Sequence, residues 1–265
     1  MDNSAIDTQQ AARIALACLD LTSLNDADSA ADIDLLCAKA QGPHGPVAAV
    51  CVWPRFVAQA RALLPVAIRV AAVANFPDGA LDTARAVREA QAIVDAGGDE
   101  IDLVLPYRAF IAGQRSACAA LVADVRRATP GRTLKLIIES SELKEAPLIR
   151  AACALGLDEG VDFLKTSTGK TPSSATPEAA RVMLETIATH ARAHARGAHV
   201  GFKASGGVRR VEDAAVYIGL TRQHLGTAAL TPARLRFGAS GLLADIEAVL
   251  SAKPDDASTA STGGY

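Results

Sequence analysis

The sequence predicts an α/β fold in which eight parallel strands alternate with helices and close into a single (β/α)8 barrel. The chain has 265 residues, of which 50% are hydrophobic, and this is enough for one large core. Aromatic residues make up only 4%, so the core must consist mostly of Ala, Val, Leu and Ile, as is usual where helices pack on a parallel sheet. Short apolar runs also recur at intervals of roughly 25–35 residues, the length of one strand–helix unit.

The eight apolar runs give the expected strands in order. They lie near Ala17–Leu21, Val47–Trp53, Ile68–Asn75, Glu100–Leu105, Leu134–Glu139, Val161–Thr166, Val200–Ala204 and Arg236–Ala239. Between the third and fourth runs, Asp82–Asp95 has apolar residues at helical spacing, and Gly97-Gly98 is expected to end that helix. Thr176-Pro177 is typical of a helix start, with threonine as the cap and proline in the first turn. A doubly wound open sheet is the alternative, but no GxGxxG follows the first strand.

The domain organisation follows from the unbroken repeat. Since no linker interrupts it, we expect one barrel domain over residues 1–252. The stretch Lys253–Tyr265 is rich in Ser, Thr, Ala and Gly, and we expect a flexible tail over residues 253–265.

Composition excludes several classes of function. The formal net charge is −2 and there is no long basic run, so we expect no nucleic-acid partner. No apolar run reaches the length of about 20 residues that spans a bilayer, and the first residues do not resemble a signal peptide. Cys18, Cys51 and Cys153 lie in apolar surroundings, which indicates reduced core residues. We therefore expect a soluble, cytoplasmic protein with no membrane partner.

Polar residues collect where the expected strands end, which is where a barrel of this kind carries its reactive groups. Lys165 ends the sixth strand, before a polar, glycine-containing turn, and Lys203 ends the seventh. Asp20 and Asp102 lie in the first and fourth strands, while the fifth strand contributes Lys135 and Glu139. Because unpaired burial of a charge costs several kcal/mol, such residues are unfavourable as packing devices. A purely structural ion network, for instance Asp102 with Lys203, is the alternative to a chemical role.

Two buried lysines on neighbouring strands predict amine chemistry. Each ammonium group lowers the pKa of the other, and burial acts in the same direction. A neutral lysine amine attacks an aldehyde and forms a Schiff base, which then serves as an electron sink for making or breaking a carbon–carbon bond. Asp102 could move protons during this reaction, and Asp20 could hold the lysines or bind a substrate hydroxyl. Such an enzyme needs no metal and no cofactor.

The last loops carry a phosphate signal. Gly206-Gly207-Val208-Arg209 follows the seventh strand and Gly238-Ala239-Ser240-Gly241 the eighth, the positions at which barrels commonly hold a phosphate group. Lys170 adds a nearby cation. Thr168-Gly169-Lys170-Thr171 is not a nucleotide-binding P-loop, because that motif has glycine where Leu164 stands. His190 and His194 have helical spacing, but we do not expect them to bind a metal.

These motifs together resemble the 2-deoxyribose-5-phosphate aldolases, which are class I aldolases with a (β/α)8 barrel. The segments that carry the resemblance, in chain order, are Leu19–Asn25, Val50–Phe56, Asn75–Pro77, Glu100–Val104, Lys135–Glu139, Phe163–Gly169, Gly201–Lys203, Gly206–Arg209 and Arg236–Ser240. So many segments in the right order cover the chain nearly from end to end.

The resemblance implies reversible cleavage of 2-deoxy-D-ribose 5-phosphate into acetaldehyde and D-glyceraldehyde 3-phosphate, in the breakdown of deoxyribonucleotides. It implies that Lys165 forms the Schiff base, that Lys203 perturbs it and that Asp102 transfers protons. It also implies a carboxy-terminal tyrosine, here Tyr265, as a candidate proton relay, with an idle chain end as the alternative. Residues implied on the small-aldehyde side are Thr22, Leu24, Cys51 and Phe76, and those around the phosphate are Lys170, Gly206, Gly207, Val208, Arg209, Gly238 and Ser240. A homo-oligomer, as a dimer, is also expected.

The sequence departs from the family pattern at two places. Ala204-Ser205 stands where relatives often have Pro-Ala, and Gly241 stands where a second serine is common. The second change removes a hydroxyl donor near the expected phosphate site, so we expect weaker selectivity for phosphorylated substrates. Two other functions stay open at this point. They are another Schiff-base sugar-phosphate aldolase or transaldolase, and a barrel that binds a sugar phosphate without turnover.

Overall fold

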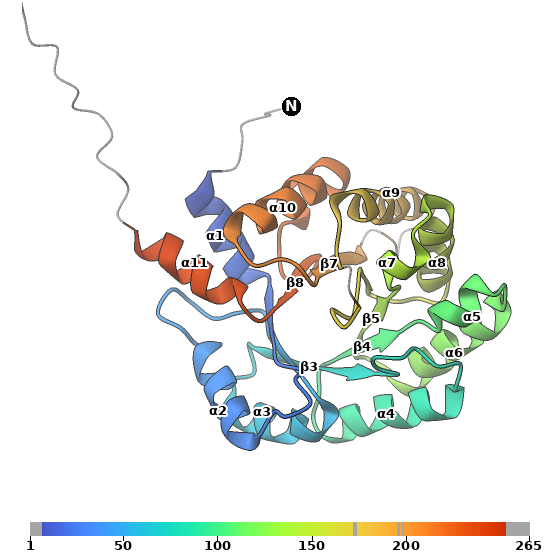
Figure 1. Cartoon of the computed structure of the whole chain (residues 1–265), viewed down its shortest axis with the longest axis horizontal. Helices are drawn as coiled ribbons and strands as arrows, with labels where there is room; N and C mark the ends of the chain where they lie inside the picture. Colours follow the sequence, from blue (N-terminus) through green and yellow to red (C-terminus); the bar gives the residue numbers. More distant parts are fainter. Residues whose placement is uncertain (1–6, 172–173, 195–196, 198, 253–265) are drawn as a thin grey trace, which may run out of the picture.

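The protein is a closed barrel of eight parallel strands, which pair with one another in sequence order. A computed structural model describes residues 7–171, 174–194, 197 and 199–252. The barrel closes where β8 pairs with β1, with Leu19 beside Phe237 and Asp20 beside Gly238. The helices surround the strands (Figure 1). The expected (β/α)8 barrel is therefore confirmed.

The strands are short, as is usual for a barrel, and each predicted strand is present. They are β1 (Leu19–Thr22), β2 (Ala49–Val52), β3 (Arg69–Ala74), β4 (Glu100–Val104), β5 (Thr133–Ile137), β6 (Phe163–Lys165), β7 (Gly201–Ser205) and β8 (Leu235–Ala239). The expected runs are longer than most of these strands. Val47 before β2 and Val161 before β6 are buried, but their backbone N–H groups donate to Ala40 and Gly156 instead of to a neighbouring strand, and hydrophobicity alone does not separate the two cases.

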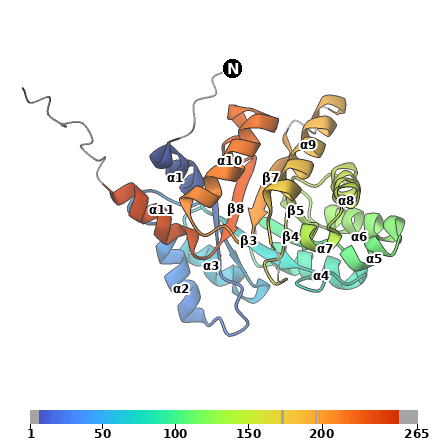
Figure 2. The same ribbon diagram turned by 45° about the horizontal axis from the view of Figure 1, so that its top comes forward.

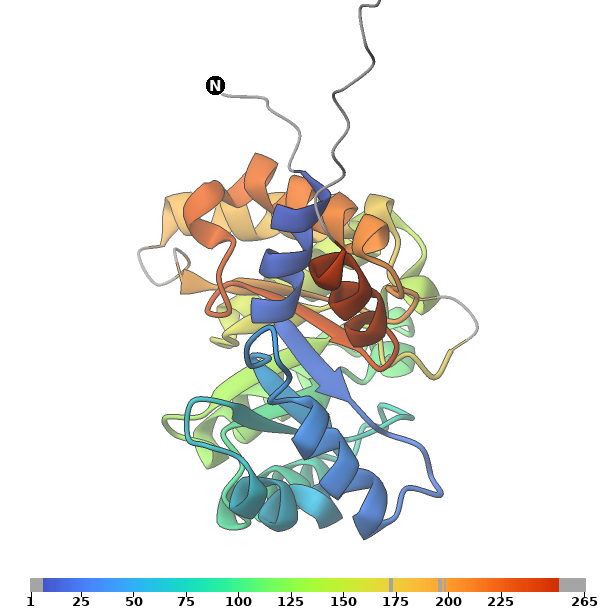
Figure 3. The ribbon, with the colours of Figure 1, turned by 90° about the vertical axis from the view of Figure 1, so that its left-hand side faces the viewer.

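The helices between the strands vary in length. They are α1 (Thr8–Ala17), α2 (Ala30–Lys39), α3 (Val57–Leu63), α4 (Thr83–Asp95), α5 (Tyr107–Ile111), α6 (Arg115–Ala128), α7 (Ser140–Leu143), α8 (Ala146–Asp158), α9 (Pro177–Ala193), α10 (Val211–Leu225) and α11 (Leu242–Ser251), with the 3-10 turns η1 (Pro54–Phe56) and η3 (Thr227–Ala229). The last helix, α11, packs beside the first, α1 (Figures 1 and 3). Along another side of the barrel, α8, α9 and α10 follow one another as packed neighbours (Figure 2).

The local signals that predicted helix ends operate as expected. The Thr176 hydroxyl accepts a hydrogen bond from the Ala179 N–H at 3.2 Å, so threonine caps α9 ahead of the proline. At the end of α4, Gly97 takes φ +90° and the Gly98 N–H donates to the Ile93 carbonyl at 2.9 Å. A left-handed residue at this position favours glycine, and it turns the chain into β4.

Alternation along the strands divides the core into two regions. Residues such as Leu103, Leu136 and Phe202 belong to the large apolar core that includes buried helix residues. The intervening positions of β4, Glu100 and Asp102, instead take part in a fully buried charged cluster. The helix–sheet layer therefore supplies the apolar burial, and the barrel interior holds the polar groups.

Three further expectations from the sequence concern the tail, membrane-spanning segments and the cysteines. The predicted tail over residues 253–265, including Tyr265, lies outside the described residues, and the domain limits stay a prediction. Among the described residues, no helix is long and apolar enough to cross a membrane. The five cysteines, Cys18, Cys37, Cys51, Cys118 and Cys153, are all buried and unbridged.

Candidate active site

The four charged residues singled out in the sequence meet inside the barrel. Lys165 on β6 and Lys203 on β7 both donate to Oδ2 of Asp102 on β4, at 2.8 and 2.7 Å. Lys203 Nζ also contacts Asp20 Oδ2 at 2.5 Å. All four side chains are 98–100% buried, and Lys165 is the only one of them with measurable exposure, at 2%. Asp20 therefore holds a lysine, which was one of its two expected roles.

Three further charged residues join this cluster, and none of them was predicted to have a role in the site. Lys135 on β5 lies 2.8 Å from Asp102 Oδ1, 2.5 Å from Glu100 Oε2 and 3.3 Å from Asp20 Oδ2. Arg236 on β8 donates to Asp20 Oδ1 at 2.6 Å and to Glu100 Oε1 at 2.8 Å. The alternation of β4 could have found Glu100, since Glu100 and Asp102 are two residues apart and must face the same side.

Strand register explains why these residues meet. Lys165 pairs with Lys203 across β6 and β7, and Lys203 pairs with Arg236 across β7 and β8. On the other side, Asp102 pairs with Lys135 across β4 and β5. The interior of an eight-stranded barrel is just wide enough for side chains to fill, so inward charges on different strands come into contact.

The charge count of the cluster is unequal. Its cations are Lys135, Lys165, Lys203 and Arg236, and its carboxylates are Asp20, Glu100 and Asp102. Full ionisation would leave one uncompensated positive charge in a buried site, which is costly. Loss of one proton from a lysine removes that excess. An arginine cannot serve, because it stays protonated in proteins.

The contacts show which lysine loses its proton most readily. Lys135 has three carboxylate partners, Lys203 has two and Lys165 has one. Burial lowers the pKa of Lys165, Asp102 opposes this effect and the Lys203 charge reinforces it, so the pKa falls below its ordinary value. Burial acts on Lys203 too, but its two carboxylates outweigh burial and raise the pKa. Of the three lysines, Lys165 is therefore the one whose surroundings lower the pKa of the amine.

The two aspartates of the cluster, Asp20 and Asp102, both have lowered pKa values. Burial alone would raise the pKa of Asp102, but the charges of Lys135, Lys165 and Lys203 outweigh it and hold the pKa well below the usual range. The pKa of Asp20 is also lowered, because Lys135, Lys203 and Arg236 together outweigh its burial. Asp102 accepts hydrogen bonds from three amines, and its Oδ2 is shared by Lys165 and Lys203.

A small apolar cluster lies beside these charges. Leu24, Cys51, Ala71 and Val73 pack together, with Phe76 partly buried against them. The Cys51 thiol lies 3.9 Å from Asp102 Oδ2, which places this cluster directly against the amine site. Burial and the Asp102 charge raise the pKa of the thiol, so Cys51 acts here as an apolar wall. Three of the four residues implied for the small-aldehyde side, Leu24, Cys51 and Phe76, are thus brought together, while Thr22 is not part of this cluster.

A network at the end of β3 fixes the loop that carries Phe76. Asn75 has φ +55°, and its backbone N–H donates to Glu89 Oε2 at 2.6 Å. Arg85 donates to Asn75 Oδ1 at 2.6 Å and also pairs with Asp78 at 2.7 Å. A left-handed asparagine with both ends of its amide hydrogen-bonded holds the following residues in one orientation. The sequence does not reveal this support, which depends on α4 packing beside β3.

A cavity of about 860 Å³ opens at the carboxyl ends of the strands. Its lining includes the predicted residues Thr22, Leu24, Lys170, Gly206, Gly207, Val208, Arg209, Gly238 and Ser240. Lys170 Nζ donates to the Leu24 carbonyl at 2.7 Å, so it crosses from the loop after β6 to the loop after β1. Gly206 and Gly207 have φ +81° and +80°, a conformation that favours glycine and brings backbone close to a ligand. A Cβ at Gly238 would lie 3.0 Å from Lys203 Cε, so the cavity wall sits directly over that lysine.

Glu139 is a buried carboxyl that contacts two residues of the cavity lining, Thr168 and Thr171, and no role was predicted for it from the sequence. It has φ +52° and accepts hydrogen bonds from the Thr168 N–H at 3.2 Å and from the Thr171 hydroxyl at 3.3 Å. Burial raises its pKa, although these hydrogen bonds and the Lys165 charge oppose the shift. Glu139 thus ties the end of β5 to the loop that follows Lys165.

His190 and His194 lie at the end of α9, with tilted rings whose centroids are 4.6 Å apart. The structure, within the ranges it describes, holds no group of three or more His, Cys, Asp or Glu side chains that could hold a metal. Tyr265 lies outside the described residues, and its role stays a prediction.

The fold and the site define a barrel enzyme of the Schiff-base aldolase class, with a buried lysine of lowered pKa beside a small apolar cluster. Comparison with known proteins agrees. Residues 14–244 match the model of the family described as DeoC/LacD family aldolase. The chain therefore belongs to the DeoC/LacD aldolase family.

Individual relatives support this membership. The deoxyribose-phosphate aldolase of Agrobacterium fabrum (strain C58 / ATCC 33970) is 46% identical over 245 residues, covering 91% of this chain and 92% of that protein. The crystal structure of a candidate deoxyribose-phosphate aldolase from Coccidioides immitis has a TM-score of 0.77 and 29% identity, over 90% of this chain and 86% of the other. The deoxyribose phosphate aldolase of Aeropyrum pernix, described as a tetramer, has a TM-score of 0.70 at 23% identity, over 94% and 99% of the two chains, and shows a similar fold.

Proposed function

We propose that the protein is a deoxyribose-phosphate aldolase, which cleaves 2-deoxy-D-ribose 5-phosphate reversibly into acetaldehyde and D-glyceraldehyde 3-phosphate. The observation that carries the proposal is the position of Lys165. It is the lysine with one carboxylate partner in a cluster that has one cation in excess. The 46% identity to the Agrobacterium fabrum enzyme supports the choice of substrate.

The first stage forms the Schiff base. The neutral Nζ of Lys165 adds to the C1 aldehyde carbon of the open-chain sugar, and the C1 oxygen leaves as water once it has received two protons. One of these protons comes from the attacking amine. The other comes from the Lys203 ammonium group, which shares Asp102 Oδ2 with Lys165 and is therefore positioned to pass a proton through that carboxylate.

The second stage breaks the carbon–carbon bond. The C3 hydroxyl loses its proton, the C2–C3 bond opens, and its electron pair moves toward the iminium nitrogen of Lys165. This releases D-glyceraldehyde 3-phosphate and leaves a two-carbon enamine. Protonation at C2 and addition of water then release acetaldehyde and restore the amine. The enamine is small and apolar, in keeping with the cluster of Leu24, Cys51 and Val73 beside Asp102.

The phosphate end of the substrate is assigned to the 860 Å³ cavity. Lys170 and Arg209 supply cations there, and the glycine pair Gly206-Gly207 supplies closely approaching backbone N–H groups. Ser205 also lines the cavity and lies two residues after Lys203 on the same strand, so the cavity wall near Lys203 is polar. This arrangement favours a substrate with an aldehyde at one end and a phosphate at the other.

The test is reductive trapping. The protein is incubated with acetaldehyde and borohydride, and the modified peptide is identified by mass spectrometry. We expect an N-ethyl group on Lys165 and none in Lys165→Ala, which should also lose cleavage of 2-deoxyribose 5-phosphate. Full activity in Lys165→Ala would sink the mechanism. Trapping by a ketone donor in place of acetaldehyde would indicate a different Schiff-base aldolase, and absence of any adduct would indicate a binding protein.

Three further parts of the proposal concern the chain as a whole. We propose a homodimer, to be tested by light scattering coupled to size-exclusion chromatography. We propose a cytoplasmic location, which the five unbridged, buried cysteines support. We also propose that Tyr265 relays protons to the enamine carbon. Deleting Tyr265 should then slow exchange of the acetaldehyde methyl protons with solvent, and an unchanged exchange rate would assign the tyrosine no role.

A further inference from the structure

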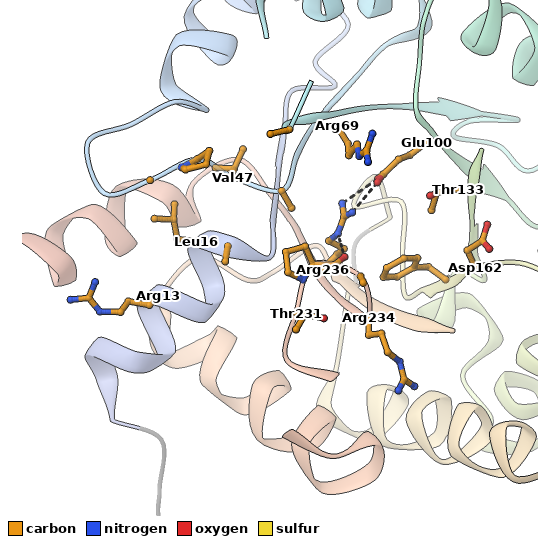
Figure 4. Close-up of a pocket in the computed structure, with 18 of the residues that line it drawn as sticks. Arg13, Leu16, Val47, Arg69, Glu100, Thr133, Asp162, Thr231, Arg234 and Arg236 are labelled. Atoms are coloured by element: carbon orange, nitrogen blue, oxygen red, sulfur yellow. Dashed lines mark hydrogen bonds and ion pairs between the residues drawn. The ribbon is translucent and has the colours of Figure 1, made fainter. Parts of the chain in front are cut away.

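The charged cluster extends through the barrel to its opposite mouth. A second cavity, of about 1040 Å³, opens at the amino-terminal ends of the strands, and Glu100 and Arg236 both line it (Figure 4). Figure 4 shows the Arg236 guanidinium directed at the Glu100 carboxylate, with their hydrogen bonds dashed. Both side chains are nonetheless nearly fully buried, at 5% and 3% exposure. They form the floor of this cavity and the lower end of the charged cluster.

Arg236 occupies carboxylate oxygens that the lysines would otherwise use. Its guanidinium takes Asp20 Oδ1 at 2.6 Å and both oxygens of Glu100, at 2.8 and 3.2 Å. Lys203 is left with Asp20 Oδ2 and must also use Asp102 Oδ2, which is the single oxygen that Lys165 contacts. Lys165 therefore shares its one acceptor with a second ammonium group because of contacts made at the far mouth.

We propose that Arg236, acting through Asp20 and Lys203, is a positioning residue that keeps the Lys165 amine short of carboxylate partners and so ready for attack. Glu100 acts in the opposite sense, because it supplies an acceptor to Arg236 and to Lys135. Neither residue lines the cavity at the carboxyl ends of the strands. Their effect on the reaction passes entirely through the ion pairs of the barrel interior.

We call the path from Arg236 through Asp20 and Lys203 to Lys165 the relay, and few charged groups face either of its ends. Asp102, Lys203, Cys51 and Glu139 face Lys165 from β4, β7, β2 and the end of β5. Asp20, Glu100, Lys135 and Cys18 face Arg236. Burial raises the pKa of Cys18 to about 12, so this thiol stays neutral. The carboxylates and amines already named are therefore the groups that transmit a change at Arg236.

Opposite charge deletions give opposite predictions. Arg236→Met leaves three lysines with three carboxylates, so all three lysines can stay charged and Lys165 keeps its proton up to a higher pH. Glu100→Gln leaves four cations with two carboxylates, so Lys165 loses its proton more readily. The double variant has three cations and two carboxylates and keeps the original excess of one. This inference depends on the proposed function, because Lys165 must first be the amine that forms the Schiff base.

The experiment measures the pH dependence of trapping at Lys165. Each full-length variant is mixed with acetaldehyde and cyanoborohydride across a pH series, and the rate of N-ethylation of the Lys165 peptide is followed by mass spectrometry. The amine adds to the aldehyde carbon, water leaves, and hydride then reduces the imine carbon as nitrogen keeps one proton. We expect the midpoint of the profile to rise by roughly 0.5–1 pH unit in Arg236→Met and to fall by a similar amount in Glu100→Gln.

Controls separate this relay from general damage. Arg236→Lys keeps the charge and should stay near the wild-type midpoint, as should the double variant. Arg69→Met removes a half-exposed arginine from the lining of the same cavity and should also leave the midpoint unchanged. Equal shifts of both single variants in one direction, or no shift in either, would overturn the proposal. If Arg236→Met does not fold, an unmoved midpoint in Glu100→Gln overturns it alone.

The same data distinguish this inference from the proposed function. Wild-type protein that traps no acetaldehyde on Lys165 would contradict the aldolase proposal itself. Wild-type trapping with variant midpoints that do not move would leave the aldolase in place and remove only the relay.

Discussion

Replacing Lys203 by methionine tests the physical reason for the lowered pKa of Lys165. The two lysine nitrogens lie 2.7 and 2.8 Å from the same oxygen of Asp102, so they are at most about 5.5 Å apart. At that separation and an effective dielectric constant of about 20, two unit charges repel by about 3 kcal/mol. This repulsion corresponds to about two pKa units. Lys203→Met should therefore raise the pKa of Lys165 markedly.

The sign of the pH effect follows from the direction of the shift. The neutral amine of Lys165 is present above its pKa and is lost as the pH falls through that value. A higher pKa moves this loss to higher pH, so the rate of Schiff-base trapping at neutral pH should fall about 10- to 100-fold and recover in alkaline solution. Trapping with acetaldehyde and cyanoborohydride reports this step separately from later proton transfers by Lys203.

A matched control is Lys39→Met, which removes one exposed lysine from α2 without touching the barrel interior. Its profile should coincide with that of the wild type. If Lys203→Met leaves the midpoint in place or lowers it, repulsion between the two ammonium groups is not what depresses the pKa of Lys165. Circular dichroism and urea unfolding of both variants confirm that folded proteins are being compared.

Three other substitutions probe the cavity. Lys170→Met removes a cation and the hydrogen bond to the Leu24 carbonyl. The KM for 2-deoxyribose 5-phosphate should therefore rise about 10- to 100-fold, while the KM for unphosphorylated deoxyribose stays constant. Equal effects on both substrates would show that Lys170 does not bind the phosphate. Gly238→Ala places a Cβ 2.7 Å from Ser205 Oγ, so urea unfolding should show a loss of about 1–3 kcal/mol, and unchanged stability would mean that Ser205 moves freely. Gly241 is the N-cap of α11, makes no side-chain cap hydrogen bond and has open space around it. Gly241→Ser should therefore raise the free energy of unfolding by a few tenths of a kcal/mol and strengthen the preference for phosphorylated substrate. An unchanged preference would show that the missing hydroxyl is not the cause of weaker selectivity.

Much of the fold could be predicted because each strand is an apolar run of its own. The existence and order of all eight strands follow from those runs, and the capping of α9 by Thr176 follows from a local motif. Strand limits were less accurate. Val161 is buried but lies before β6, since burial and sheet pairing end at different residues.

The site could be predicted only in part. Lys165, Lys203 and Asp102 are recognisable because a charge within an apolar strand is unusual. Which lysine is neutral depends on the number of carboxylates near each one, and those carboxylates come from strands far apart in the sequence. The contact between Asp20 and Lys203 joins residues 183 positions apart and exists because the barrel closes. The left-handed backbone of Glu139 likewise has no glycine to mark it in the sequence.

The alternation of side chains along the strands gives the protein two sets of positions that can change independently. Leu103, Leu136 and Phe202 face the helices, and repacking them alters the free energy of unfolding without displacing a charge. Asp102, Lys135 and Lys203, each the sequence neighbour of one of these residues, form ion pairs in the barrel interior and, in the proposed mechanism, set the reactivity of the amine. Thermal tolerance and catalytic pH range are therefore encoded in alternate residues of the same strands. Substitutions at one set of positions can therefore change thermal tolerance while the catalytic pH range stays the same, and the reverse holds for the other set.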